Sequence, residues 1–140
     1  MAYTDKEELT ARYGDEIAQL IDRDNSGSED TDALDSVIND ADSIIDGYLA
    51  GRYATPLKKV PQQVIEIASE ITRYKLWDDK APEEVRKRYE DAMKRLRDIA
   101  TGLITLTIDK VPLATAGNSV AYTERERTFT DCTLKGFVGQ

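Results

Sequence analysis

Apolar side chains recur every three or four residues through the middle of the chain, and this spacing predicts amphipathic α-helices. The clearest set spans residues 34–49, a second spans 64–77 and a third spans 85–100. The first set consists of Leu34, Val37, Ile38, Ala41, Ile44, Ile45, Tyr48 and Leu49. The second set has the broadest apolar face, which predicts the most buried helix, with Tyr74 and Trp77 as core or interface anchors.

Two shorter helices are predicted before the first long one. Thr4 and Glu7 have the spacing of a capping box, which indicates a helix start, and Gly14 is a natural terminator. A second short apolar run covers residues 17–21. After a polar loop, Thr31 is the expected cap of the long helix.

Prolines and a glycine bracket the two later helices. Pro61 and Pro82 suit helix starts, and Gly102 suits the end of the last helix. Four acidic side chains in this last helix precede a Lys or Arg by four residues. Such pairs contribute little to stability and indicate an exposed flank.

The pattern changes after Gly102. Residues 103–108 alternate with threonine and predict a short strand, which must pair within the tail or with another copy. Residues 113–140 contain too few apolar side chains to form a core alone, so we expect them to order on contact with a partner. The apolar side chains expected at a subunit or portal interface are Phe129, Leu134, Phe137 and Val138.

These patterns predict an all-α fold. We expect a small bundle of four main helices over residues 1–102, followed by an extended, partly β or disordered C-terminal arm over residues 103–140. The length of 140 residues is that of one domain large enough to bury a core without disulfides or metals.

The composition excludes several classes of protein. The chain has no histidine and a single cysteine, Cys132, which excludes His-dependent catalytic groups, imidazole metal ligands and an internal disulfide. No apolar run approaches the ~18–20 residues of a membrane span, and the N-terminus has no signal-peptide pattern. We therefore expect a soluble, non-secreted protein that is not an enzyme, with no cofactor, no metal and no membrane partner.

Charge is distributed unevenly along the chain. Residues 1–51 hold 14 acidic and 3 basic side chains, whereas residues 52–101 hold 9 acidic and 12 basic ones. An acidic first third repels phosphate, so sequence-specific nucleic-acid binding is not expected. Two interpretations remain open: well-solvated helix faces, or complementary flanks through which one copy meets the next or a basic partner.

An acidic loop resembles the start of an EF-hand calcium loop. Residues 22–27 place oxygen ligands at positions one, three and five and glycine at position six, but position twelve is Ala33 instead of a bidentate glutamate. The simpler interpretation is a turn whose side chains bind their own backbone. The alternative is a low-specificity cation site, and with it a small acidic cation-responsive regulatory module. Its ligands would be Asp22, Asp24, Ser26 and Asp30.

A second set of carboxylates follows the first long helix. Asp35, Asp42 and Asp46 recur on the face opposite the apolar one. Acid–base catalysis needs carboxylates in unlike environments, and a stripe facing water offers like ones. We therefore interpret the stripe as a solvated face.

Several short stretches of the chain carry a family resemblance. They are Ile45-Asp46-Gly47-Tyr48-Leu49-Ala50-Gly51-Arg52-Tyr53, Pro56-Leu57, Val60-Pro61, Tyr3-Thr4 with Leu9 and Gly14, and Ile71-Thr72-Arg73-Tyr74-Lys75-Leu76. Together they resemble the Mu-like tailed-phage head–tail joining family, whose members are connectors or adaptors of about this length. The resemblance covers the whole chain and carries no catalytic residues with it.

The resemblance implies a non-enzymatic virion protein at the head–tail junction, made in the host cytoplasm. Its expected partners are further copies of itself, in a ring of possibly twelve, together with the portal protein and tail-proximal proteins. A ring repeats one heterologous interface, which needs two unlike flanks. In such a ring we expect Asp35, Asp42 and Asp46 to face the DNA channel, where repulsion of phosphate lets DNA slide.

Overall fold

The computed structural model describes residues 2–108, and all regular secondary structure in this range is helical. Two short helices, α1 (Lys6–Tyr13) and α2 (Asp15–Ile21), precede the long helix α3 (Thr31–Leu49). Helix α4 (Gln62–Trp77) leads through a single 3₁₀ turn, η1 (Asp78–Lys80), into α5 (Glu83–Thr101). The all-α prediction is confirmed, and none of these helices is long and apolar enough to cross a membrane.

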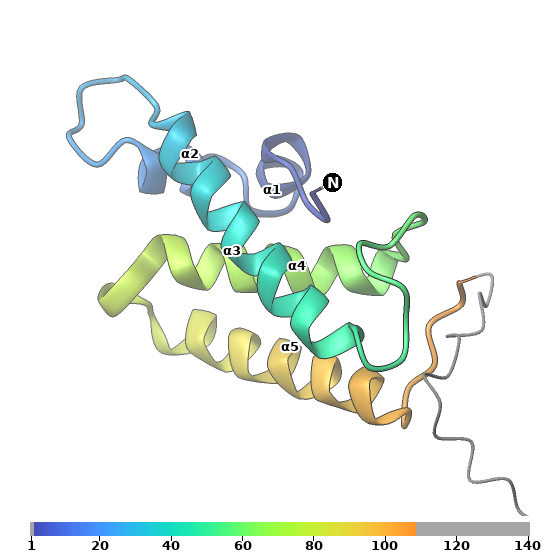
Figure 1. The fold of residues 1–140 in the computed structure, drawn as a ribbon. Helices are drawn as coiled ribbons and strands as arrows, with labels where there is room; N and C mark the ends of the chain where they lie inside the picture. Colours follow the sequence, from blue (N-terminus) through green and yellow to red (C-terminus); the bar gives the residue numbers. More distant parts are fainter. Residues whose placement is uncertain (1, 109–140) are drawn as a thin grey trace, which may run out of the picture.

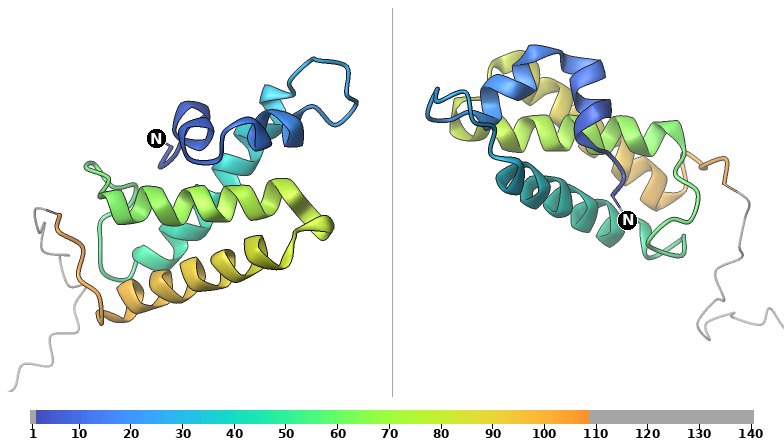
Figure 2. Two further views of the ribbon diagram at one scale, coloured as in Figure 1. Left: turned by 180° about the vertical axis from the view of Figure 1, so that it is seen from behind. Right: turned by 90° about the horizontal axis from the view of Figure 1, so that it is seen from above.

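Helices α4 and α5 lie antiparallel, and α3 crosses both of them (Figure 1). Helices α1 and α2 pack against α4 on another side, and α2 also contacts α3 (Figure 2). The loop between α2 and α3 projects from one end of the molecule, and α5 forms the opposite side (Figure 1).

The molecule has two apolar clusters, and α3 and α4 contribute to both. The terminal cluster joins α1 and α2 to the start of α3 and the end of α4. Its buried members are Leu9, Ile17, Ile21, Leu34, Ile38 and Leu76. The central cluster lies between α3, α4 and α5. Its buried members are Tyr3, Ala41, Ile45, Leu49, Leu57, Val64, Ile67, Ala68, Ile71, Ala92, Leu96, Ile99 and Leu106.

The predicted N-terminal caps are each wrong by one residue. Asp5 caps α1 by accepting the N–H of Glu8 at 2.8 Å, and Asp30, not Thr31, caps α3. Thr4 is buried, and its hydroxyl lies 3.1 Å from that of Ser69. The Thr4 hydroxyl contacts α4 and so does not cap α1, and the neighbouring Asp5 carboxylate is the N-cap instead.

The other helix boundaries follow the predicted signals. Pro61 and Pro82 occupy the N-cap positions of α4 and α5. Gly14 ends α1, and Gly102 ends α5 in the left-handed conformation with φ of 87°. The Arg52 guanidinium lies against Gly102 where a Cβ atom would sit, so both backbone conformation and space favour glycine there.

The predicted strand over residues 103–108 is wrong. This segment is irregular, and Leu106 is buried in the central cluster. The Leu106 N–H donates to the Tyr53 hydroxyl at 3.1 Å, which satisfies a backbone donor without a neighbouring strand. Residues from 109 onward, including most of the predicted arm, lie outside the described part of the chain.

Tyr3 links the N-terminal segment to α3 and to the loop between α3 and α4. Its N–H donates to Asp42 Oδ1 at 3.1 Å, and its hydroxyl donates to Asp46. The same hydroxyl accepts the N–H of Leu57 at 3.0 Å. Burial and the hydrogen bond to Asp46 raise the pKa of Tyr3 to about 12, so the hydroxyl stays protonated and keeps its donor.

We predict that Tyr3→Phe lowers the free energy of unfolding by about 1–3 kcal/mol, because the buried N–H of Leu57 loses its acceptor. Urea denaturation monitored by circular dichroism measures this change. Tyr48→Phe is the matched control, since Tyr48 is a half-buried tyrosine on the same bundle. Equal stability of the Tyr3 variant and the native chain would contradict the role given to the hydroxyl.

Candidate functional site

The acidic loop between α2 and α3 is organised by its own backbone. Asp22 Oδ1 accepts the N–H of Ser26 and Asp22 Oδ2 accepts that of Gly27, both at 3.0 Å. Ser26 Oγ accepts the N–H of Ser28 at 3.3 Å. The interpretation of this loop as a turn bound by its own side chains is therefore confirmed.

The remaining proposed calcium ligands are not gathered around one point. Asp30 Oδ1 accepts the N–H of Ala33 at 3.0 Å as the cap of α3, and Asp24 is exposed. Within residues 2–108, no group of three or more Cys, Asp or Glu side chains is placed to hold a metal ion.

The predicted stripe of solvated carboxylates on α3 is wrong for Asp42. Asp35 is exposed, but Asp42 is only 9% exposed and Asp46 is half-buried. Both inner carboxylates bind Tyr3, whose segment covers this part of the helix. Because Asp42 and Asp46 have these structural roles, the three residues do not form a uniformly solvated stripe along α3.

Burial raises the pKa of the Asp42 carboxyl above its usual value. The hydrogen bond from the N–H of Tyr3 opposes this rise, and the charge of Asp46 adds to it. A buried carboxylate costs free energy unless hydrogen bonds compensate for lost water. The N–H of Tyr3 supplies part of that compensation, which makes the N-terminal segment part of the folded core.

An ion pair that the sequence did not predict fastens α2 to α4. Arg73 Nε and Nη2 donate to the two oxygens of Glu16 at 3.1 and 2.9 Å, and Trp77 Nε1 donates to Oε1 at 2.5 Å. The Arg73 guanidinium also lies 4.6 Å from the centre of the Tyr13 ring on α1. One arginine on α4 thus binds both short helices.

The same contacts set the pKa of Glu16. Burial alone would raise it, but hydrogen bonds from Arg73 and Trp77 and the positive charge of Arg73 together lower it below its usual value. With only 12% of the Arg73 side chain exposed, this ion pair is shielded from water more than a surface pair.

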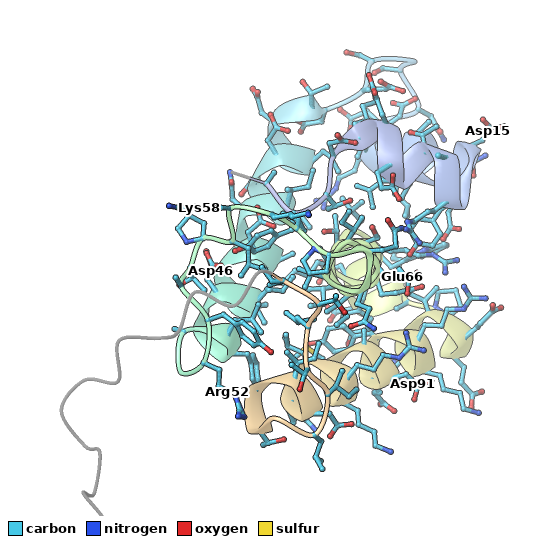
Figure 3. The ribbon with its side chains drawn as sticks, turned by 90° about the vertical axis from the view of Figure 1, so that its right-hand side faces the viewer. Asp15, Asp46, Arg52, Lys58, Glu66 and Asp91 are labelled. Atoms are coloured by element: carbon cyan, nitrogen blue, oxygen red, sulfur yellow. The ribbon has the colours of Figure 1, made fainter. Side chains whose placement is uncertain are left out.

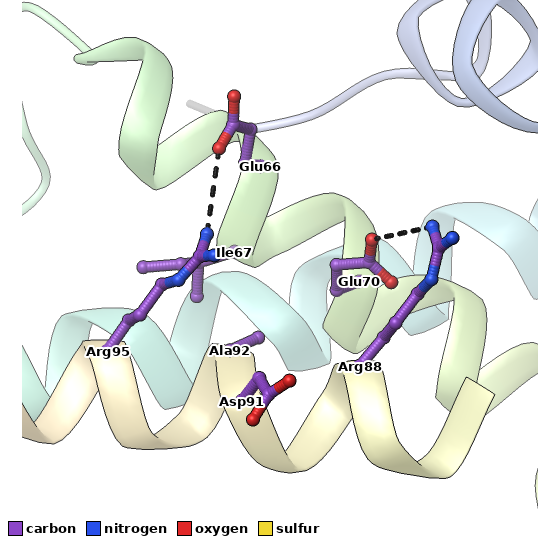
Figure 4. A pocket seen from close by; sticks show the side chains of 7 residues that line it. All are labelled: Glu66, Ile67, Glu70, Arg88, Asp91, Ala92 and Arg95. Atoms are coloured by element: carbon purple, nitrogen blue, oxygen red, sulfur yellow. Dashed lines mark ion pairs between the residues drawn. The ribbon is translucent and has the colours of Figure 1, made fainter. Parts of the chain in front are cut away.

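A charged groove of about 230 Å³ runs between α4 and α5 (Figure 4). Arg95 reaches from α5 to Glu66 on α4, and Arg88 reaches to Glu70, each with nitrogen and oxygen 3.8 Å apart. Arg88 also makes the predicted pair with Glu84, at 2.9 Å. The groove is a row of ion pairs between two helices, in which Arg88 and Arg95 pair with two of its three carboxylates.

The outer side of α5 carries a second hollow, of about 570 Å³. It is lined by Tyr89, Glu90, Asp91, Met93, Lys94 and Arg97. The Tyr89 ring stacks on that of Tyr74, with ring centres 4.0 Å apart and planes at 11°. Tyr74 therefore anchors this surface from α4, as the sequence had suggested for an aromatic anchor.

The four apolar arm residues predicted at an interface lie outside the described residues. They are Phe129, Leu134, Phe137 and Val138. Of the predicted arm, the structure describes residues 103–108, in which Leu103 is 81% exposed and Leu106 is buried.

Comparison with known proteins gives the family of this bundle. Residues 3–123 match the model of the family described as "Bacteriophage Mu, Gp36". The chain belongs to the bacteriophage Mu Gp36 family. The Mu-like prophage FluMu protein gp36 of Haemophilus influenzae is 35% identical over 108 residues, which are 74% of each chain. Gene product J of Escherichia phage Mu is 27% identical over 104 residues, 73% of this chain and 74% of that protein.

Membership of the Gp36 family confirms the resemblance to Mu-like phage proteins. This Gp36-family member is accordingly a phage structural or morphogenesis protein. The match covers every helix described above and part of the sequence beyond residue 108.

We predict that Glu16→Gln lowers the free energy of unfolding at pH 7 by about 1.5–3 kcal/mol, because a charge-assisted, bidentate bond is lost. Since the folded pKa of Glu16 is lowered, its contribution is complete above the unfolded pKa of 4.5 and is lost as the pH falls through the folded value. The variant should thus lose less stability on acidification than the native chain. Urea denaturation over a pH series tests this, with the exposed Asp15→Asn as control. If the unfolding free energies of Glu16→Gln and the native chain fell in parallel on acidification, the stabilising role given to the Glu16 carboxylate would be refuted.

We also predict that millimolar calcium leaves the melting temperature unchanged, because the Asp22 oxygens already bind backbone N–H groups. A calcium site saturated at 100 times its Kd would add about 2.7 kcal/mol and raise the melting temperature visibly. Differential scanning fluorimetry with and without calcium, and with magnesium as a control cation, measures the effect. A rise with calcium that Asp24→Asn abolishes would establish the cation-responsive alternative instead.

Proposed function

We propose that this chain is a subunit of a head–tail connector, a non-enzymatic part of the virion. Copies assemble into a ring beneath the portal, around the channel through which DNA passes, and the tail-proximal proteins attach on the far side. The observation that carries the proposal is membership of the Gp36 family across residues 3–123. The copy number of twelve is what the resemblance to head–tail joining proteins implies.

The architecture suits a ring subunit. A ring forms when one heterologous interface repeats until rotation closes it, so a subunit needs two unlike faces held at a fixed angle. Because α3 and α4 contribute to both apolar clusters, the two ends of the bundle form one rigid unit. A fixed angle between the two faces repeats the same rotation at every contact, and a ring forms where that rotation closes.

The C-terminal residues supply a second kind of contact in this proposal. Leu106 fixes the chain to the bundle, while Leu103 exposes 81% of its surface. A further 32 residues follow Ile108, and they include Phe129, Leu134, Phe137 and Val138. We propose that these apolar side chains bind a neighbouring subunit or the portal, where they are buried only after assembly.

We predict that Phe129→Ser/Phe137→Ser abolishes binding to the portal protein of the same phage, because the variant loses two aromatic anchors. Native mass spectrometry of the mixture gives the stoichiometry. The bundle should stay helical by circular dichroism, since both substitutions lie beyond its cores.

Thr130→Ala/Thr133→Ala is the matched control, because it changes the same stretch of the arm without removing apolar surface. It should bind the portal as the native chain does. A native chain that never binds a portal ring, in any ratio or salt concentration, would refute the connector proposal.

A further inference from the structure

Helix α5 presents a basic surface on the side that faces away from the bundle. The buried residues Val85, Ala92, Leu96 and Ile99 define its inner side. Helical spacing places residues 83, 86, 87, 90, 94 and 97 opposite that inner side; all six are exposed, and Glu83 and Glu90 among them are acidic. Four of them are basic. We call Arg86, Lys87, Lys94 and Arg97 the basic face.

The basic face differs from the ion-paired flank of the same helix. Arg88 and Arg95 turn to α4 and pair with its glutamates. No ion pair within residues 2–108 involves Lys94 or Arg97. Both line the outer hollow of about 570 Å³. Glu90 and Asp91 line the same hollow but, within residues 2–108, form no ion pair with Lys94 or Arg97, whose charges are therefore available to a partner.

Aromatic and thioether groups lie in the same hollow. Tyr89 and Met93 line it beside Lys94 and Arg97, and stacking on Tyr74 holds the Tyr89 ring in place. Tyr, Met and Arg are enriched in the cores of protein–protein interfaces, and a rigid aromatic loses little entropy on binding. A basic surface with such a hollow fits an acidic protein segment.

The chain itself contains an acidic segment of this kind. Residues 22–35, the acidic segment, hold six carboxylates and one arginine. Two of the carboxylates bind backbone N–H groups and Glu29 pairs with Lys6, but Asp24, Asp32 and Asp35 are exposed. The loop at the start of this segment projects from the end of the molecule opposite α5, in Figure 1 and in Figure 3.

We propose that the basic face of one copy binds the acidic segment of a second copy, so that subunits join head to tail. The inference rests on the proposed connector function and names the interface from which the ring is built. Opposite charges attract across this contact, whereas two basic faces or two acidic segments repel each other. The contact is therefore heterologous, and its two halves lie on separate parts of the subunit, as ring closure requires.

Charge-swap variants of the full chain test the contact. Lys94→Glu/Arg97→Glu reverses the basic face, and Asp32→Lys/Asp35→Lys reverses the acidic segment. Each variant alone should self-associate on the order of tenfold more weakly than the native chain. Mixed in equal amounts, the two should associate again, because every contact in an alternating assembly then joins opposite charges. Sedimentation velocity measures the assembly, and circular dichroism verifies the fold.

Matched controls carry the same change in charge elsewhere. Lys58→Glu/Lys59→Glu alters two exposed lysines, and Lys58 lies on the other side of the molecule from Asp91 of α5 (Figure 3). Glu7→Lys/Asp15→Lys alters two exposed carboxylates on α1 and α2. Both controls should assemble as the native chain does. Added salt should weaken native assembly, because it screens exposed charges.

The outcomes separate this inference from the connector proposal. Undiminished assembly of either swap variant alone, or failure of the mixture to associate, would overturn the proposed contact. A basic-face variant that assembles normally but no longer binds double-stranded DNA would also overturn the proposed contact, since the native basic face would then bind phosphate. If each charge-swap variant associates weakly and the mixture associates again, but no native assembly binds a portal, the proposed contact between copies is supported and the connector function is refuted.

Discussion

The crossing of α3 over the α4–α5 pair is the constraint on which the rest of the structure depends. The first half of α3 buries Leu34 and Ile38 in the terminal cluster, and its second half buries Ile45 and Leu49 in the central one. A helix shared by two cores fixes their relative orientation, because interiors are close-packed and resist sliding. The acidic segment at the start of α3 is consequently held at a set angle to the outer side of α5.

The acidic first third of the chain performs two different tasks. Some carboxylates complete the fold: Asp5 caps α1, Asp42 binds the N-terminal backbone and Glu16 joins α2 to α4. Others, such as Asp32 and Asp35, remain exposed. Formal net charge does not distinguish these groups, although a carboxylate bound inside the fold contributes far less to long-range attraction than an exposed one.

Local patterns predicted the helices, whereas the contacts between distant segments decided the rest. Apolar spacing and helix-end residues act within a few positions, so the long helices were found from sequence alone. The burial of Asp42 depends on Tyr3, and the path of Leu106 depends on the hydroxyl of Tyr53, 53 residues away. The bond of Glu16 to α4 spans 57 residues. The spacing of residues along the sequence does not reveal such distant contacts. It therefore predicted that Asp42 on α3 is solvated, although the segment that contains Tyr3 covers it.

The proposed contact between copies is weak by its physical nature, and this weakness suits assembly on a template. Exposed ion pairs contribute about 0–1 kcal/mol each, and salt screens them. A pair of free subunits would gain little beyond the apolar surface around Tyr89 and Met93. Binding of each arm to a common partner raises the effective concentration of neighbouring bundles and makes the same weak contact sufficient. Free subunits therefore associate weakly through this contact, and the ring closes where the partner is.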